Sequence, residues 1–100
     1  MSDRVEAASS RFVAPVEREK RLWKPIAARI FGKNGDQQIL IRNLSVNGLQ
    51  ATCESALTPG ETLTVTFLDG QILECEVRWF RSGMFGARTN KSIDLKSLLS

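Results

Sequence analysis

Apolar and polar side chains alternate along most of the chain from Pro25 onward. In residues 62–67, leucine, valine and phenylalanine occupy every second position, and threonines occupy the positions between them. This period of two, with many β-branched residues, is typical of a strand that buries one face. Residues 72–80 repeat the pattern, and their apolar positions are Leu73, Cys75, Val77 and Trp79. The alternation therefore predicts a β-strand at each place.

Turn residues separate the apolar runs. Asp69-Gly70 follows the first of these strands directly and is a strong signal for a β-hairpin. Glycine and proline mark further turns at 34–36, 59–60 and 81–83. The remaining apolar runs predict strands at 25–31, 37–44, 48–53 and 84–89. About six short strands, spaced by roughly 8–12 residues, predict a small antiparallel β-barrel or sandwich. A closed barrel would also leave no unpaired strand edge.

The C-terminal residues change pattern and predict one short helix over about 93–99. Ser92 or Asp94 is its expected N-terminal cap. Its apolar side, docked at an end of the barrel, would be formed by Ile93, Leu95, Leu98 and Leu99. Residues 1–17 show no sustained periodicity and are expected to form a flexible tail ahead of one domain at 18–100. The predicted fold is all-β, a six-stranded antiparallel barrel with a short C-terminal α-helix.

The composition is that of an ordinary globular domain and argues against several kinds of chemistry. Of the 100 residues, 42% are apolar and 25% are charged. No apolar run approaches the roughly 20 residues of a membrane-spanning helix, and the N-terminus lacks a signal-peptide pattern. A cytoplasmic protein without membrane insertion is therefore expected. The chain has no histidine, which argues against a zinc site and against a histidine-activated nucleophile. We expect neither a metal site nor enzyme activity.

The two cysteines, Cys53 and Cys75, do not form a CxxC pair. Each lies on the apolar phase of a predicted strand. Cysteines in such positions behave as small apolar side chains, and both are expected to be buried and reduced.

The positive charge is concentrated in residues 18–24, a segment that we call the basic lead-in. The formal net charge of the chain is +3. The lead-in holds this whole excess, because one anion, Glu19, stands among four cations, Arg18, Lys20, Arg21 and Lys24. Such a cluster can contact phosphates, or it can be a solvated surface. Its position along the chain does not decide between them.

Polar residues interrupt the middle of the chain in the segment RNLSVNGLQ, residues 42–50. Asn43 and Ser45 are two apart, so on an extended backbone both side chains lie on one face. Gly48 removes a side chain where a backbone or a flat ligand can approach closely. An amide and a hydroxyl beside a glycine can bond the edge of a planar heterocycle. Alternatively, Asn43 and Ser45 satisfy amides of the turn, and Gly48 supplies a positive φ.

This arrangement resembles the PilZ domains, bacterial receptors for cyclic di-GMP. The family is marked by an RxxxR segment, followed by a (D/N)xSxxG segment that Asn43, Ser45 and Gly48 match at each specified position. The run VRWFRSGMFGART, residues 77–89, resembles the late hairpin of the family, and SIDLKSLL, residues 92–99, resembles its final helix. The resemblance covers roughly residues 18–99 and implies a six-stranded split barrel.

The first family motif is incomplete in this chain. Arg21 stands 22 residues before Asn43, but the residue four before Arg21 is Glu17, and Arg18 stands three before it. Lysine does not copy the bidentate fork of arginine, and a glutamate would repel a dianionic ligand. A shift of one residue within the lead-in would let Arg18 serve as the first arginine.

The resemblance also implies the roles of the site residues. Arg18 and Arg21 would hold phosphates and guanine edges, and Lys20 or Lys24 would add charge. Asn43 and Ser45 would bond a guanine, and Gly48 would make room for it. Trp79 is a candidate platform on which a base could stack, although its phase with Val77 favours the core.

A cyclic di-GMP receptor is therefore the leading functional hypothesis. Binding would order the basic lead-in and change the surface that an effector protein contacts, with no cofactor required. The second hypothesis is a PilZ-fold adapter that contacts proteins and binds no nucleotide. The third is a basic barrel that binds single-stranded nucleic acid. The seven aromatic residues, mostly in core phase, and the single basic cluster argue against it.

Overall fold

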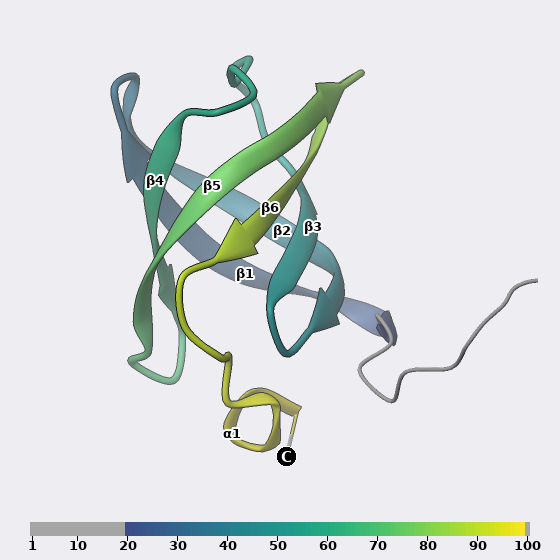
Figure 1. Cartoon of the computed structure of the whole chain (residues 1–100). Coiled ribbons are helices and arrows are strands. Elements are labelled where there is room, and N and C mark those ends of the chain that lie inside the picture. Colours follow the sequence, from purple (N-terminus) through teal and green to yellow (C-terminus); the bar gives the residue numbers. More distant parts are fainter. Residues whose placement is uncertain (1–19, 100) are drawn as a thin grey trace, which may run out of the picture.

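The computed structural model describes residues 20–99, which form a closed barrel of six antiparallel strands with a short helix at one end (Figure 1). This confirms the predicted fold class. The elements are β1 (Lys20–Gly32), β2 (Gly35–Ser45), β3 (Gly48–Thr52), β4 (Thr62–Phe67), β5 (Ile72–Arg81), β6 (Met84–Thr89) and α1 (Leu95–Leu99). The predicted tail 1–17 and Arg18 lie outside the described residues. In β1 only the backbone of Lys20, Arg21 and Trp23 is described.

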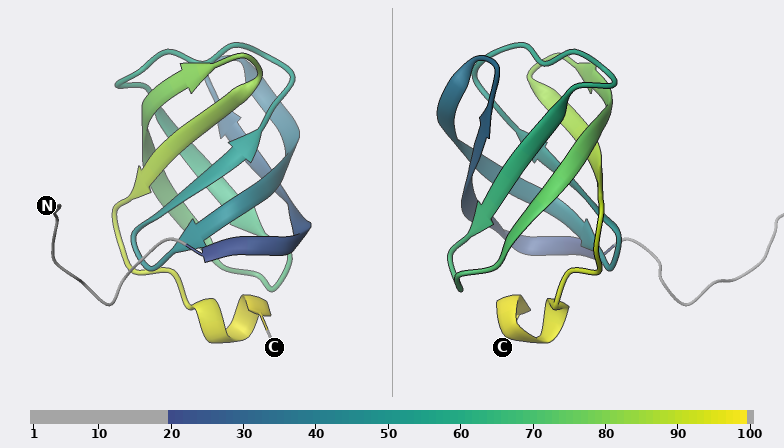
Figure 2. Two further views of the ribbon diagram at one scale, coloured as in Figure 1. Left: turned by 90° about the vertical axis from the view of Figure 1, so that its right-hand side faces the viewer. Right: turned by 60° about the vertical axis from the view of Figure 1, so that its left-hand side comes forward.

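The strands follow the order β1-β2-β3-β6-β5-β4 around the barrel. Two three-stranded meanders, β1-β2-β3 and β4-β5-β6, are joined by the long connection from β3 to β4 (Figure 2). Two pairings close the cylinder: β1 with β4, and β3 with β6. Every strand therefore has a partner on both sides.

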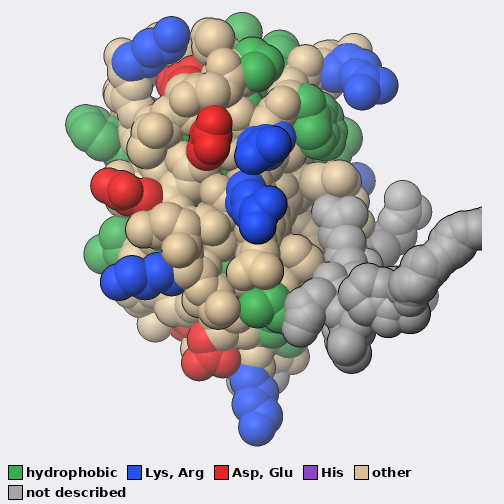
Figure 3. Space-filling model, viewed as in Figure 1, with side chains coloured by type: hydrophobic (Ala, Val, Ile, Leu, Met, Phe, Trp, Pro, Cys, Tyr) green, Lys and Arg blue, Asp and Glu red, His purple; other side chains and the backbone are tan. Residues whose placement is uncertain are grey.

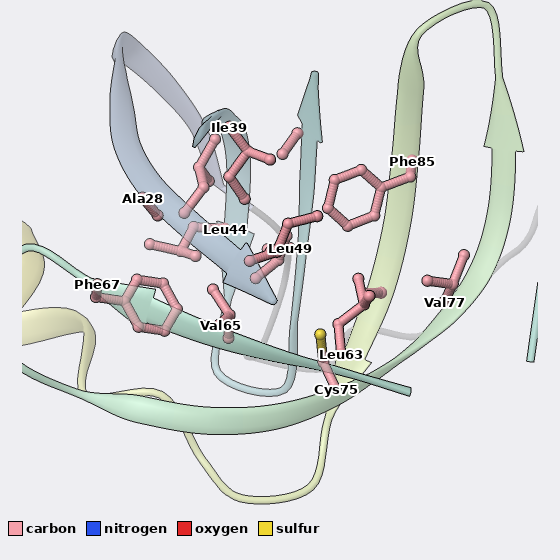
Figure 4. Packing of buried hydrophobic residues seen from close by; sticks show 14 of the residues in the cluster. Ala28, Ile39, Leu44, Leu49, Leu63, Val65, Phe67, Cys75, Val77 and Phe85 are labelled. Carbon is pink, nitrogen blue, oxygen red and sulfur yellow. The ribbon is translucent and has the colours of Figure 1, made fainter. Parts of the chain in front are cut away.

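The inward positions of the alternating runs form the core (Figure 4). Leu63, Val65 and Phe67 of β4 are 2% exposed or less, as their period of two predicts. Phe85 and Val77 are fully buried beside them. Both cysteines are free thiols, with Cys75 buried as predicted and Cys53 only half-buried. Because β3 ends at Thr52, Cys53 already belongs to the loop.

The predicted turns are present where glycine allows a positive φ. Gly60 has φ +94° and Gly70 has φ +101°, in the Pro59-Gly60 and Asp69-Gly70 turns. The β5–β6 hairpin has two central residues, Ser82 with φ 49° and Gly83 with φ 78°. Positive φ at both positions is what a tight hairpin connection requires.

The helix begins later than predicted, at Leu95. Asp94 caps it, because its carboxylate accepts a hydrogen bond from the Ser97 amide at 3.2 Å. Ile93 precedes the helix and is buried at the end of the barrel, while Leu95 and Leu98 pack partly against the core. Leu99 was predicted to join this apolar side, but it is 43% exposed. Leu95, Leu98 and Leu99 stand at i, i+3 and i+4 and share one side of the helix, but Leu99 is its last residue and extends beyond the end of the barrel core.

The first strand was predicted to begin at Pro25, after the basic lead-in, but β1 already begins at Lys20. Arg21 pairs with Asn43 and Lys20 pairs with Leu44, so this segment belongs to the sheet through its pairing with β2. The next pair is Ile26 with Ile41, which leaves residues 22–25 opposite the single residue 42. A large bulge therefore stands in the middle of the strand, where Pro25 has no amide to donate.

Candidate functional site

Two rows of residues cross the outside of the barrel from β2 to β5, and together we call them the outer rows. The first row joins Asn43, Gln50, Gly86 and Trp79 through successive register pairs. The second row joins Ser45, Gly48, Arg88 and Glu76 in the same way. The pairing thus brings Trp79 to the same surface as the three residues of the NxSxxG segment.

Trp79 lies on the outside because of a bulge in β5. Val77 pairs with Ala87 and Trp79 pairs with Gly86, so Arg78 is an extra residue. After this bulge the phase reverses, and Phe80 replaces Trp79 on the inner side, where it packs against the core. The prediction that Trp79 belongs to the core is therefore wrong. A period of two is reliable only while the strand has no inserted residue.

The indole of Trp79 lies against Gly86 around its Nε1 atom, and Gly86 has no side chain to hold it away. A Cβ on Gly86 would come 2.6 Å from Cε2 of the indole. The Arg81 guanidinium lies 5.7 Å from the ring centroid, within cation–π range. A shallow pocket beside the ring is lined by Ser45, Gly48, Leu49, Gln50, Arg78, Trp79, Gly86 and Ala87. An aromatic wall therefore adjoins the hydroxyl of Ser45.

Gly48 is required by a close approach of two strands. A Cβ at this position would lie 2.9 Å from the carbonyl oxygen of Ala87 on β6. The expectation of a close backbone approach is confirmed. The alternative, a positive φ at Gly48, is wrong, because its backbone is not among the positive-φ glycines. β3 can pair with β6 here only if no side chain intervenes.

Asn43 and Ser45 both make hydrogen bonds within the β2–β3 hairpin. The Asn43 amide donates to Oε1 of Gln50 at 2.7 Å. The Ser45 hydroxyl donates to the Gly48 carbonyl at 3.3 Å, which is long for a hydroxyl. Both side chains are half-buried on the outer rows, as their spacing of two residues predicts. Both residues are therefore partly exposed, although each side chain already has a hydrogen-bond partner.

The predicted cations are not all brought together. Arg21 stands in register with Asn43, at the end of the first outer row. Lys24 lies in the β1 bulge and lines a different groove, which includes Leu68 and Leu98 near helix α1. The pairing therefore supports a place near the outer rows for Arg21. The pairing gives no such support for Lys24, whose contact with the ligand stays a prediction.

Sequence reasoning missed several polar residues of this surface. Arg78 and Arg88 lie over β5 and β6, where Figure 3 shows basic and acidic side chains together in the middle of the face. Glu76 approaches Arg78 at 4.0 Å, with both side chains exposed. The alternation of β6 could have placed Arg88 on the outside. Its proximity to Gly48 depends on the β3–β6 pairing, which no local pattern reveals.

The described part of the chain offers little for metal or thiol chemistry. No group of three or more Cys, Asp or Glu side chains among residues 20–99 could hold a metal ion. Burial raises the pKa of the Cys75 thiol to about 11, and it also raises the pKa of Cys53. Thiols with raised pKa values are poor nucleophiles at neutral pH. In this same region, no helix has the length and apolar character needed to span a bilayer.

One comparison with known proteins identifies a family for this chain. The family model described as "PilZ domain" matches residues 15–100. A search of curated proteins found no match. The matched span contains β1 to β6, helix α1 and the complete NxSxxG segment.

Proposed function

The chain belongs to the PilZ domain family, whose members are generally cyclic di-GMP receptors, and on this premise we propose that it binds cyclic di-GMP on the outer rows. The observation that carries this proposal is the gathering of Asn43, Ser45, Gly48 and Trp79 on one surface of the barrel. These residues come from three strands, and one of them reaches the surface only through a bulge. We infer that this surface receives a flat base.

A guanine would stack on the exposed side of the Trp79 ring. Stacking of a base on an aromatic side chain contributes roughly 1–3 kcal/mol. Ser45 lines the same shallow pocket and would hydrogen-bond the base edge. Asn43 lies next to Gln50 in the first outer row and donates a hydrogen bond to its side chain. Asn43 would hydrogen-bond the base edge after that bond is broken. The base therefore gains both a stacking face and polar partners from the barrel.

Arg21 and Arg18 would hold the phosphates of the ligand. The register pair Arg21–Asn43 supports this role for Arg21, because it starts the first outer row. Arginine binds phosphate through paired hydrogen bonds from a planar fork. The role of Arg18 rests on the resemblance of the lead-in to the RxxxR segment, with Lys20 adding charge.

Binding would join the lead-in to the outer rows and thereby change one face of the protein. An effector protein that contacts this face would distinguish the bound from the free state. The protein would then act as a receptor and adapter, not as an enzyme. The signal would depend on an effector protein that contacts the bound state and the free state differently.

Isothermal titration calorimetry with cyclic di-GMP tests the proposal. We expect the unmodified protein to bind, and Ser45→Ala to weaken binding about tenfold through loss of a hydrogen bond in a desolvated pocket. Arg21→Ala should weaken it by roughly ten- to hundredfold, since a charge-assisted contact is lost.

Matched controls are available on other parts of the barrel. Ser55→Ala alters a serine of the exposed β3–β4 loop, and Arg29→Ala removes an exposed arginine that pairs with Asp36 at 2.7 Å. Both should bind as the unmodified protein does. Absence of binding by the unmodified protein would refute the proposal, and equal losses in the controls would refute the assigned location.

One observation favours a second candidate function, an adapter that binds no nucleotide. Asn43 and Ser45 already have hydrogen-bond partners in the hairpin, which is what a purely structural role requires. A ligand that binds only the folded state raises the melting temperature. An unchanged melting temperature at a high concentration of cyclic di-GMP would therefore support the adapter.

A further inference from the structure

A polar groove continues the second outer row beyond Gly48. It runs along β5 and β6 and is lined by Asn47, Thr62, Glu74, Cys75, Glu76, Arg88, Thr89 and Asn90. Because Asn47 precedes Gly48 directly, the groove begins where the NxSxxG segment ends. It is separate from the shallow pocket beside Trp79 and shares no lining residue with it.

Arg88 is the cation of this groove, and its guanidinium forms no ion pair with a side chain of the part of the chain that the structure describes. It is exposed on β6 and stands in register between Gly48 and Glu76. The ion pairs formed among residues 20–99 include Arg78–Glu76 but none that involves Arg88. Gly48 pairs with Arg88 across β3 and β6 and has no side chain that could cover the Arg88 side chain. The guanidinium fork can therefore approach a ligand that rests on Gly48.

The charges of the groove fit a base better than a phosphate. Glu74 and Glu76 line it together with Arg88, so its carboxylates would repel a phosphate group. Guanine instead offers two adjacent acceptors, N7 and O6, which suit an arginine fork. Its remaining edge carries N–H donors, for which carboxylates are good acceptors.

We propose that this groove is a guanine subsite, in which Arg88 donates a bidentate pair of hydrogen bonds to N7 and O6 of one guanine of the ligand. This inference rests on the proposed function, because the guanine belongs to bound cyclic di-GMP. The other guanine occupies the pocket beside Trp79. Arg88 thus selects guanine over bases that lack the paired acceptors.

The test uses cyclic di-GMP and an analogue in which 7-deazaguanine replaces both bases, which removes N7 and leaves the phosphates unchanged. Calorimetry gives the affinity of each for the unmodified protein, Arg88→Ala and Arg88→Lys. Lys91→Ala serves as the matched control, because Lys91 is an exposed cation outside the groove. Circular dichroism confirms that each variant is folded.

We expect Arg88→Ala to weaken binding of cyclic di-GMP about tenfold, as loss of one bidentate base contact should. The affinity ratio between cyclic di-GMP and the deaza analogue should also shrink about tenfold in this variant. Arg88→Lys should behave like the alanine variant, because an ammonium group has no fork. Lys91→Ala should change neither quantity.

Failure of the proposed function can be distinguished from failure of the guanine subsite. If the unmodified protein does not bind cyclic di-GMP, the proposed function fails and this inference fails with it. If binding occurs and Arg88→Ala leaves the affinity unchanged, only the guanine subsite is refuted. If Arg88→Ala weakens both ligands equally and the ratio is kept, Arg88 contacts a phosphate, and the assignment to guanine is overturned.

Discussion

At the scale of single residues, two glycines of the outer rows decide what lies beside them. Gly48 lets the Ala87 carbonyl of β6 approach β3, and Gly86 lets the Trp79 ring lie against the sheet. Neither glycine supplies a positive φ. Each is needed for the space that a side chain would fill, and each therefore shapes the proposed binding surface directly.

Gly86→Ala should displace the Trp79 ring, because the new Cβ would overlap the indole. The chain contains two tryptophans, so a Trp23→Phe background isolates the fluorescence of Trp79. In that background we expect a shifted emission maximum and weaker binding of cyclic di-GMP. The free energy of unfolding should fall by about 1–3 kcal/mol, as for other overpacked sites. An unchanged emission spectrum would contradict the packing of Trp79 on Gly86.

Cys75 provides a second prediction at this scale. Burial raises its pKa from 9.0 to about 11, so the folded state holds the proton more tightly than the unfolded state. Its contribution to stability is complete below pH 9 and is lost as the pH rises through 11. Urea titrations should show up to about 3 kcal/mol of this loss, two pKa units at 1.36 kcal/mol each.

The comparison is between Cys53→Ser and the double variant Cys53→Ser/Cys75→Ala. Because the double variant lacks the buried thiol, its stability should fall less between pH 9 and 11. If the free energy of unfolding fell equally with pH in the two variants, Cys75 would titrate as an exposed thiol does. In the single variant, a thiol reagent at pH 8 should react only as fast as the protein opens.

At the scale of elements, side chains of the β4–β5 turn bind the helix to the barrel, in addition to the packing of Leu95 and Leu98 against the core. The Gln71 side chain donates to the Asp94 carbonyl at 3.1 Å and accepts from the Asp94 amide at 2.9 Å. Gln71 also donates to Asp69 at 2.7 Å, and the Ser97 hydroxyl donates to the same carboxylate. The β4–β5 turn therefore fixes both the cap and the first turn of α1. A five-residue helix needs such contacts, because it is too short to be stable alone.

Gln71→Ala should release the helix while the barrel stays folded. We expect a loss of about 1 kcal/mol, because the bonds are exposed to water. Amides of α1 should exchange hydrogen faster, and those of β4 should be unaffected. Uniformly faster exchange across the molecule would show that the turn stabilises the whole barrel. Gln38→Ala, at an exposed position on β2, is the control.

Acid should have a similar local effect. Hydrogen bonds from Ser97 and Gln71 lower the pKa of Asp69 below its usual 3.8. The contribution of Asp69 to stability is therefore present above pH 3.8 and is lost as the pH falls through the lowered pKa. Helix amides should lose protection in this range, and Asp69→Asn should reduce the pH dependence.

At the scale of the whole molecule, the proposed binding surface spans both meanders. β2 and β3 supply Asn43, Ser45 and Gly48, while β5 and β6 supply Trp79 and Arg88. The surface exists only where β3 pairs with β6 and closes the barrel. The site and the global fold are therefore formed by the same event.

Unfolding should accordingly be a single transition. In the Trp23→Phe background, urea titrations monitored by Trp79 fluorescence and by circular dichroism should coincide. If the fluorescence changed at lower urea, the β3–β6 closure would open before the remaining sheet. The ligand should move both curves equally, because it binds only the closed barrel.

The domain boundary is also a prediction for the whole molecule. β1 begins at Lys20, and the family match begins at residue 15. We predict that residues 18–100 fold without 1–17, with a loss of less than about 1 kcal/mol. That loss corresponds to a shift of the melting temperature below about 4–8 °C. A larger shift would place the N-terminal boundary earlier.

The sequence alone determined much of this protein. Alternation identified the inward residues of β4, such as Leu63 and Val65, because side-chain direction along a regular strand depends only on the period of two. Glycine and proline located the turns, since few other residues tolerate those backbone angles. The spacing of Asn43 and Ser45 placed both on one outer face for the same reason.

Only the tertiary structure decided which outward residues meet. The bulge at Arg78 moved Trp79 from the predicted core to the surface, and pairing with β2 drew the lead-in into β1. The β3–β6 register placed Arg88 beside Gly48. A bulge or a register depends on hydrogen bonds between segments that are distant in the chain. The period of a single strand therefore contains no information about them.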